Sequence, residues 1–178
     1  MTQITNFLVI LLLYNEKEDP SMKQNPWELI ASIQTLSISS INENHTAHSS
    51  YAPFIENKHK FYVCISGMAK HAQNLLNNKN ISCLIIEDES KSTNIFARKR
   101  VTFDMQVTPI ERNSLIFNGA MTLFRDKFGD SARIYESMLD FQLFELTPLL
   151  GRAVFGFGEA YDFRDGDFTT NATGMMSK

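Results

Sequence analysis

The stretch KFYVCISGMAKHAQNLLNNKNISCLIIE, residues 60–87, decides the fold of this chain. Residues 60–66 are rich in β-branched and aromatic side chains, which is typical of a strand. Residues 69–77 place their apolar side chains on one face of a short helix. Residues 81–87 are almost continuously apolar, as in a central strand. The order strand, short helix, strand predicts a helix that connects two strands of a mainly β domain.

The sequence on either side extends this pattern. Residues 35–41 alternate between apolar and polar side chains and lead through Asn42-Glu43-Asn44 into a second strand, as in a hairpin. Many short antiparallel strands with a few helices predict an α+β, mainly β, barrel of about six to seven strands with short flanking helices. The expected strands are residues 35–41, 47–55, 60–66, 81–87, 100–110, 141–147 and 153–163, and the expected helices are 26–34, 69–77, 112–128 and 131–139.

Length and composition indicate one domain. The 178 residues are 43% hydrophobic and 21% charged, which is the composition of a globular protein with a real core. The polar, glycine-containing end of the chain is typical of a frayed terminus. We expect a disordered N-terminal extension over residues 1–22, a barrel domain over 23–164 and a flexible tail over 165–178.

Charge and apolar patterning exclude several classes of partner. A net charge of −3 gives no general attraction to nucleic acids or anionic membranes. The apolar run at residues 7–14 is much shorter than the roughly 20 residues of a membrane span, and no basic segment precedes it as in a signal peptide. Cys64 and Cys83 lie in apolar runs, where reduced thiols act as small hydrophobes. These features predict a cytoplasmic protein with no nucleic-acid or membrane partner.

Ser66, Lys70 and His71 surround the start of the predicted helix 69–77. Backbone N–H groups and the positive end of a helix favour an anion, so these side chains are candidates for binding a phosphate. The alternative is an ordinary solvated helix start.

Arg98 and Arg100 form a second cationic cluster. In the same groove as Lys70, these arginines would suit a phosphate or a propionate. The alternative is that they form ion pairs with the acidic run at residues 87–89. The four histidines have no metal-motif spacing, so no metal site is assigned. No glycine-rich phosphate loop, nucleophile elbow or HExxH motif is present, which removes the commonest nucleotide-binding, hydrolase and metalloprotease classes.

Several blocks in a fixed order resemble the haem-utilisation proteins of the HugZ/HutZ type, within the pyridoxamine 5'-phosphate oxidase-like, FMN-binding split-barrel superfamily. The resemblance covers roughly residues 29–163. Its blocks are Ser50-Tyr51-Ala52-Pro53-Phe54, Ala69-Lys70-His71-Ala72 followed by Asn74-Leu75, Ile85-Ile86-Glu87-Asp88-Glu89, Phe96-Ala97-Arg98-Lys99-Arg100-Val101-Thr102-Phe103-Asp104, and Gly156-Phe157-Gly158 followed by Ala160-Tyr161.

This resemblance implies a homodimer of split β-barrels with a ligand groove at the subunit interface. In flavin-binding relatives, the segment matching Ser66, Lys70 and His71 holds the FMN phosphate together with an arginine of the 97–100 block, where Arg98 and Arg100 lie. The strand around Ser50 and Tyr51 lies beside the flavin ring.

In the haem-handling branch, the resemblance implies that His71 pairs across the interface with Asp140. Such a pair would fix the imidazole tautomer. Haem-binding members carry an axial histidine near the C-terminus, whereas no histidine follows Tyr161 here. Met175 and Met176 are thioether alternatives, and His48 and His71 are imidazole alternatives.

The resemblance leads to a first hypothesis of a dimeric haem-utilisation protein, with or without oxidative opening of the porphyrin to release iron. The alternatives are an FMN-dependent oxidoreductase and a carrier of haem or flavin without turnover. Whether the chain is an enzyme stays open at this point, because no residue in the sequence is assigned a catalytic role.

Overall fold

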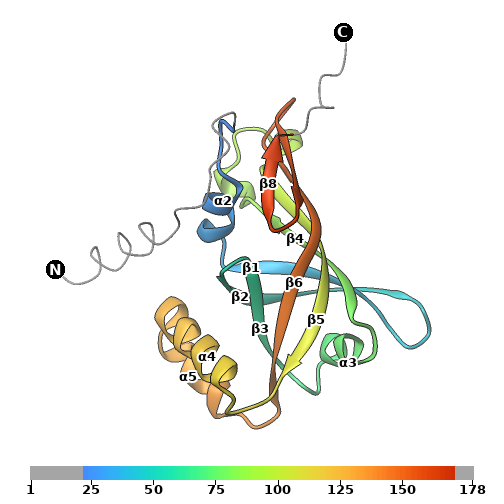
Figure 1. Cartoon of the computed structure of the whole chain (residues 1–178), viewed down its shortest axis with the longest axis vertical. Helices are drawn as coiled ribbons and strands as arrows, with labels where there is room; N and C mark the ends of the chain where they lie inside the picture. Colours follow the sequence, from blue (N-terminus) through green and yellow to red (C-terminus); the bar gives the residue numbers. More distant parts are fainter. Residues whose placement is uncertain (1–21, 171–178) are drawn as a thin grey trace, which may run out of the picture.

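The computed structural model describes residues 22–170, and Figure 1 shows the arrangement of its strands and helices. Most of residues 1–22, the expected N-terminal extension, and residues 171–178, which include Met175 and Met176, lie outside the described residues. In chain order the elements are α2 (Pro26–Ser32), β1 (Thr35–Ile41), β2 (Ala47–Asn57), β3 (Lys60–Ser66), α3 (Lys70–Asn77), β4 (Asn80–Ile86), the 3₁₀ turns η1 (Glu89–Lys91) and η2 (Ile95–Ala97), β5 (Arg100–Ile110), α4 (Leu115–Phe128), α5 (Asp130–Ser137), β6 (Phe141–Val154), β7 (Ala160–Arg164) and β8 (Asp167–Thr170).

A closed barrel forms the centre of the molecule. The strands of residues 22–170 make one eight-stranded antiparallel sheet in the order β3-β2-β1-β4-β5-β6-β7-β8, and an additional β3–β6 pairing closes the first six into a barrel. The pairing of β3 with β6 runs from Phe61 opposite Leu146 to Ser66 opposite Phe141. β7 and β8 extend the sheet beyond the closure (Figure 1). The predicted mainly β split barrel is confirmed.

Aromatic rings fill the barrel interior. The rings of Phe61 and Phe103 have centroids 5.4 Å apart, and Phe163 meets Phe103 edge-on at 5.3 Å. Trp27 of α2 lies over this group and stacks on the His59 ring with centroids 4.0 Å apart. Tilted and edge-on ring pairs contribute roughly 0.5–1.5 kcal/mol each beyond the burial of their area. The rings therefore join α2 and the β7–β8 hairpin to the barrel.

A second apolar cluster lies outside the barrel, where the α4–α5 hairpin covers β2, β3 and β6. Ile55, Tyr62 and Leu143 of these strands pack against the buried side chains of the two helices. Gly129 separates α4 from α5 with a φ of +63°, in the left-handed region that favours glycine, as the sequence predicted. Figure 1 shows the two helices side by side on one flank of the barrel.

The prediction of separate strands at residues 141–147 and 153–163 is wrong. β6 continues from Phe141 to Val154, and its register against β5 shifts where Met105 lies opposite Pro148 and Asp104 opposite Leu150. A bulge of this kind tolerates a proline within a sheet, so Pro148 does not end the strand.

A glycine allows β6 to cross the aromatic core. A Cβ atom at Gly151 would lie 2.5 Å from Cδ1 of Phe103 and 2.8 Å from the carbonyl oxygen of Thr102. The strand then turns through Gly156 and Gly158, with φ of +71° and +89°, into β7. The sequence predicted a bend or a close approach at these last two glycines, and the bend is what forms.

The expected flexible tail from Asp165 is wrong for its first residues. β8 pairs with β7, and Phe168 is only 1% exposed within the aromatic core. Its burial removes a large apolar surface from water, which explains why a polar-looking segment is ordered. Among residues 22–170, no helix is long and apolar enough to cross a membrane.

Replacement of Glu145 by alanine should destabilise the barrel closure. Glu145 lies opposite Tyr62 in the β3–β6 pairing, accepts hydrogen bonds from Tyr62 Oη at 2.8 Å and Lys60 Nζ at 2.7 Å, and is 8% exposed. Burial, and then the Glu145 carboxylate, raise the pKa of Tyr62, so its hydroxyl stays a donor. Glu145→Ala should lower the free energy of unfolding by about 1–3 kcal/mol, because it leaves a buried donor without an acceptor.

Urea unfolding followed by Trp27 fluorescence measures this effect. Tyr62→Phe is the matched control, since it removes the donor together with its need for an acceptor, and should cost less. Equal stability of Glu145→Ala and the wild type would contradict this account of the closure.

Candidate functional site

A pocket of about 440 Å³ lies between the α4–α5 hairpin and the strands β2 and β3. Its volume falls within the roughly 300–1,000 Å³ typical of ligand pockets, which are mainly apolar with a few polar groups. The wall on the helical side is aromatic, and the described lining contains no lysine or arginine. The pocket is lined by Tyr51, Ala52, Pro53, Cys64, Ile65, Ser66, Ala69, His71, Met121, Phe124, Phe128, Ser131, Ala132, Tyr135 and Phe141.

Lys127 fixes the end of α4 that forms one wall of this pocket. Its Nζ donates hydrogen bonds at 3.1 Å to the carbonyl oxygens of Ile33 and Phe54, and lies 4.4 Å from the centroid of the Phe54 ring. Burial lowers the pKa of Lys127. The side chain therefore ties the hairpin to β2 and to the segment that enters β1.

Arg112 holds the other end of the hairpin, and Arg125 joins its two helices. Arg125 Nη1 donates to the Glu136 carboxylate at 2.6 Å and joins α4 to α5. Arg112 donates to the carbonyl oxygens of Glu136, Met138 and Phe141 at 2.9, 2.7 and 3.0 Å, which satisfies the end of α5 and the start of β6. The pocket wall is thus braced at both ends.

Ser66 gives the pocket a polar edge and bonds to Asp140, which is not itself in the described lining. Ser66 Oγ donates to Asp140 Oδ2 at 2.7 Å, and the amide of Gly67 donates to the Asp140 carbonyl oxygen at 2.7 Å. A Cβ at Gly67 would lie 2.9 Å from that oxygen, so glycine permits the close approach. The β3–β6 closure therefore places the Asp140 carboxylate directly beside the start of α3.

His71 lies in the first turn of α3 and lines the same pocket. Burial, and secondarily the nearby His48, lower the pKa of the His71 imidazole. A neutral imidazole therefore dominates at neutral pH. Within residues 22–170 no hydrogen bond involves the His71 ring. The ring therefore offers a nitrogen lone pair to an apolar pocket.

Of the remaining predicted residues, Tyr51 is in the described lining of this pocket, and the others are not. Tyr51 is 69% exposed at its rim, and Ser50 lies on β2 with its Oγ buried and unbonded among the described residues. Lys70 lines a different hollow, beside Gln73 and Asn77. The three residues predicted around the helix start thus diverge, with Ser66 and His71 on one side and Lys70 on the other.

Arg98 and Arg100 lie at the connection between β4 and β5. Arg98 Nε donates to the Glu87 carbonyl oxygen at 3.0 Å and Nη1 to Glu89 Oε1 at 2.9 Å. Arg100 Nη1 donates to the Arg98 carbonyl oxygen at 3.1 Å. Arg98 therefore pairs with the acidic run, which is the alternative considered from the sequence.

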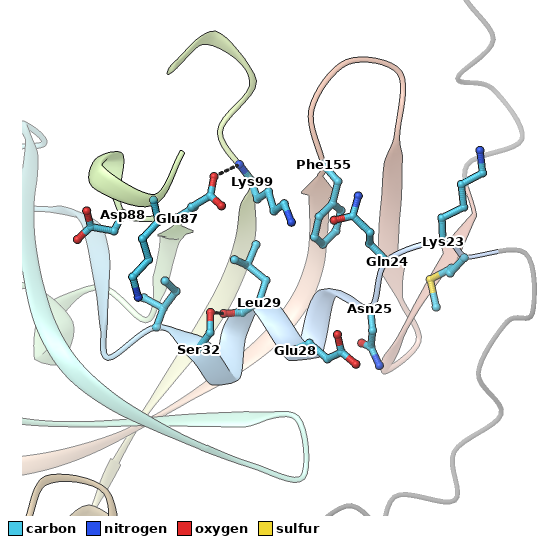
Figure 2. A pocket seen from close by; sticks show the side chains of 13 residues that line it. Lys23, Gln24, Asn25, Glu28, Leu29, Ser32, Glu87, Asp88, Lys99 and Phe155 are labelled. Carbon is cyan, nitrogen blue, oxygen red and sulfur yellow. Dashed lines mark hydrogen bonds between the residues drawn. The ribbon is translucent and has the colours of Figure 1, made fainter. Parts of the chain in front are cut away.

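A second pocket, of about 470 Å³, lies between α2 and this connection (Figure 2). Its charges offset one another, since Glu28, Glu87 and Asp88 face it together with Lys23, Lys91 and Lys99. No residue predicted as a site residue lines it, and no group of three metal-ligating side chains occurs among residues 22–170. The apolar pocket beneath the hairpin is therefore the stronger candidate.

Sequence reasoning missed the aromatic wall. Phe124, Phe128 and Tyr135 carry helical spacing, and that spacing alone is equally typical of an ordinary core. The partial exposure of Tyr135, at 42%, is the feature that separates a pocket wall from a core, and it becomes visible only in the fold.

A closed six-stranded antiparallel barrel with a helical hairpin over an apolar pocket defines a split-barrel protein with a candidate ligand site. The chain belongs to the pyridoxamine 5'-phosphate oxidase family, whose model matches residues 22–155.

Its similarity to the HutZ type is confirmed by sequence and structure. The chain is 37% identical over 134 residues to the heme oxygenase HutZ of Vibrio cholerae, a match that spans 75% of this chain and 76% of the relative. The crystal structure of that organism's HutZ, described as a heme storage protein, has a TM-score of 0.68 at 34% identity and covers 71% of this chain and 91% of its own. Campylobacter jejuni ChuZ has a TM-score of 0.79 at 29% identity, over 98% of this chain and 73% of its own.

Replacement of Lys127 by methionine should loosen the pocket wall. Methionine keeps most of the apolar stem but leaves two carbonyl oxygens without their donor, so the free energy of unfolding should fall by about 1–3 kcal/mol. Amide hydrogen exchange should also become faster in α4, which measures the hairpin directly. Arg133→Met is the control, because Arg133 is exposed on α5 and outside the pocket lining. Unchanged exchange in Lys127→Met would contradict the anchoring role.

Proposed function

We propose that this protein is a haem-utilisation protein that binds haem in the pocket beneath the α4–α5 hairpin. The observation that carries the proposal is an aromatic-walled pocket with a neutral imidazole at its edge, in a chain 37% identical to a heme oxygenase. Flat aromatic and aliphatic side chains suit the faces of a porphyrin, and the open rim would leave its propionates in water or in contact with cations.

The proposal includes a homodimer with the pocket at the subunit interface. Its support is the charge of the pocket, because the described lining holds no cation for a propionate. Lys70, Arg98 and Arg100 point elsewhere within the subunit, so the basic contacts would come from the second copy. His71 would meet Asp140 of the partner subunit, whose carboxylate has oxygen lone pairs beyond the bond to Ser66.

Haem itself would supply the redox chemistry. With an external reductant and oxygen or peroxide, its porphyrin ring would also be the substrate that is opened oxidatively. The chain would contribute three things. The hairpin aromatics would exclude water from the porphyrin faces, Ser66 and Asp140 would hold a polar network at the edge, and His71 would supply a nitrogen lone pair. In the haem-loaded protein with ascorbate, loss of the Soret band with iron release would assign ring opening, and a persistent Soret band would assign storage.

FMN binding is the second candidate function. The family description favours it, since the matching model is that of pyridoxamine 5'-phosphate oxidase. In that case Lys70, His71 and an arginine of the 97–100 block would hold the phosphate, and Tyr51 would lie beside the ring. Saturable FMN binding, without a specific hemin response, would assign this function instead of the first.

Blocking the pocket should prevent haem binding. A hemin titration of the wild type should give a saturable Soret band, and Ser131→Trp should weaken the affinity by about tenfold or more, because the indole occupies space at the pocket lining. Arg133→Trp is the matched control, since it adds the same ring to α5 outside the lining. Absence of a saturable band in the wild type, or equal affinities for the two tryptophan variants, would contradict the proposal.

Replacement of Asp140 by asparagine should weaken the dimer near neutral pH. A carboxylate accepts a stronger hydrogen bond than an amide oxygen, so the variant should shift toward monomer in sedimentation velocity at pH 6–8. Ser66→Ala separates this effect from the bond within the subunit, because it removes the 2.7 Å contact and keeps the carboxylate. A monomeric wild type, or identical profiles for wild type and Asp140→Asn, would remove the cross-subunit pair.

A further inference from the structure

The described lining of the apolar pocket offers five side chains with atoms that ligate haem iron in proteins. They are a thiol, a thioether, an imidazole and two phenols, and their geometries differ enough to separate them. They belong to Cys64, Met121, His71, Tyr51 and Tyr135.

The two sulfur groups are poorly suited. Cysteine ligates as a thiolate, but burial raises the pKa of Cys64 to about 11, so its thiol keeps its proton at neutral pH. Met121 is 1% exposed within the cluster that packs the hairpin onto the barrel. Turning its sulfur into the pocket would open a gap in that cluster.

One of the two phenols is held in a ring stack, and the other is largely exposed to solvent. The ring of Tyr135 stacks on Phe141, with centroids 5.1 Å apart and an interplanar angle of 20°. Tyr51 is 69% exposed at the rim. Both rings therefore suit contact with the faces or edges of a flat ligand better than ligation.

His71 meets the requirements that the others fail. Its ring lines the pocket, is half-buried and takes part in no hydrogen bond within residues 22–170. The ring is held in the first turn of α3, where the buried Asn74 side chain bonds to Ser40 Oγ at 3.0 Å and fixes the helix on β1.

We propose that His71 is the residue that ligates haem iron in this protein. This inference rests on the proposed haem binding and names the atom type that holds the metal. One ring nitrogen binds iron, and the other is free to donate to a carboxylate. Such a partner orients a ligating imidazole and increases its basicity. In the proposed dimer this carboxylate would be Asp140 of the partner subunit, which a serine holds as Ser66 holds Asp140 here.

His48 is the group to separate from His71. It is the histidine whose charge acts on the His71 ring, and it lies on β2, the strand that carries the pocket rim. It is not among the residues of the pocket lining. His48→Ala is therefore the matched control, since it removes a neighbouring imidazole and leaves the pocket wall unchanged.

The experiment is resonance Raman spectroscopy of the ferrous haem complex, together with a hemin titration, for the full chain. The wild type should show an iron–histidine stretching band, and His48→Ala and Cys64→Ser should keep it. His71→Ala should lose the band and bind hemin about tenfold or more weakly. Free imidazole added to His71→Gly should restore a histidine-like spectrum, and circular dichroism should show both variants folded.

The outcomes distinguish the inference from the proposed function. A wild type without a saturable Soret band refutes haem binding itself. If the wild type binds haem, three results refute only the assignment of His71. They are an iron–histidine band that persists in His71→Ala, a band that is lost in His48→Ala, and a His71→Gly variant that imidazole does not rescue. Should His71→Ala prove unfolded, His71→Asn gives the same readout with a polar side chain at this half-buried position.

Discussion

The pairing of β3 with β6 is the constraint on which the rest of the structure depends. It converts an open antiparallel sheet into a barrel and encloses the aromatic core. The same pairing brings Ser66, at the end of β3, to Asp140, just before β6, although 74 residues separate them in the chain. The polar edge of the pocket is therefore a direct product of barrel closure, and the Tyr62–Glu145 bond lies within the same ladder.

The pocket exists because the α4–α5 hairpin covers the outside of the barrel incompletely. Near β2, β3 and β6 the helices bury Phe117, Ala120 and Met121, while further along Phe128 and Tyr135 stay partly exposed and face an open space. Lys127 and Arg112 fix the two ends of the hairpin through backbone carbonyl oxygens, and Arg125 joins its helices. A rigid aromatic wall beside a strand end gives a site whose shape is largely set before a ligand binds.

Much of the fold could be predicted from local pattern, because period-two alternation and glycine breaks are local signals. Strands 35–41 and 60–66 and the break at Gly129 follow from residues close in sequence. The continuity of β6 through Pro148 could not be predicted, because it depends on a register shift against β5. The order of β8 depends on one residue, Phe168, reaching a core built by distant strands. At the site, Ser66 and His71 line one pocket, whereas Lys70 and Arg98 face other partners that only the packing of the chain reveals.

The central claim is that the space between the α4–α5 hairpin and β3 holds a porphyrin. A crystal structure of the haem-loaded protein tests it most directly. The account predicts haem density against Phe124, Phe128 and Tyr135, with the His71 ring on the iron. Haem in the charged pocket beside α2, or bound only at the outer surface with the aromatic-walled pocket empty, would contradict it.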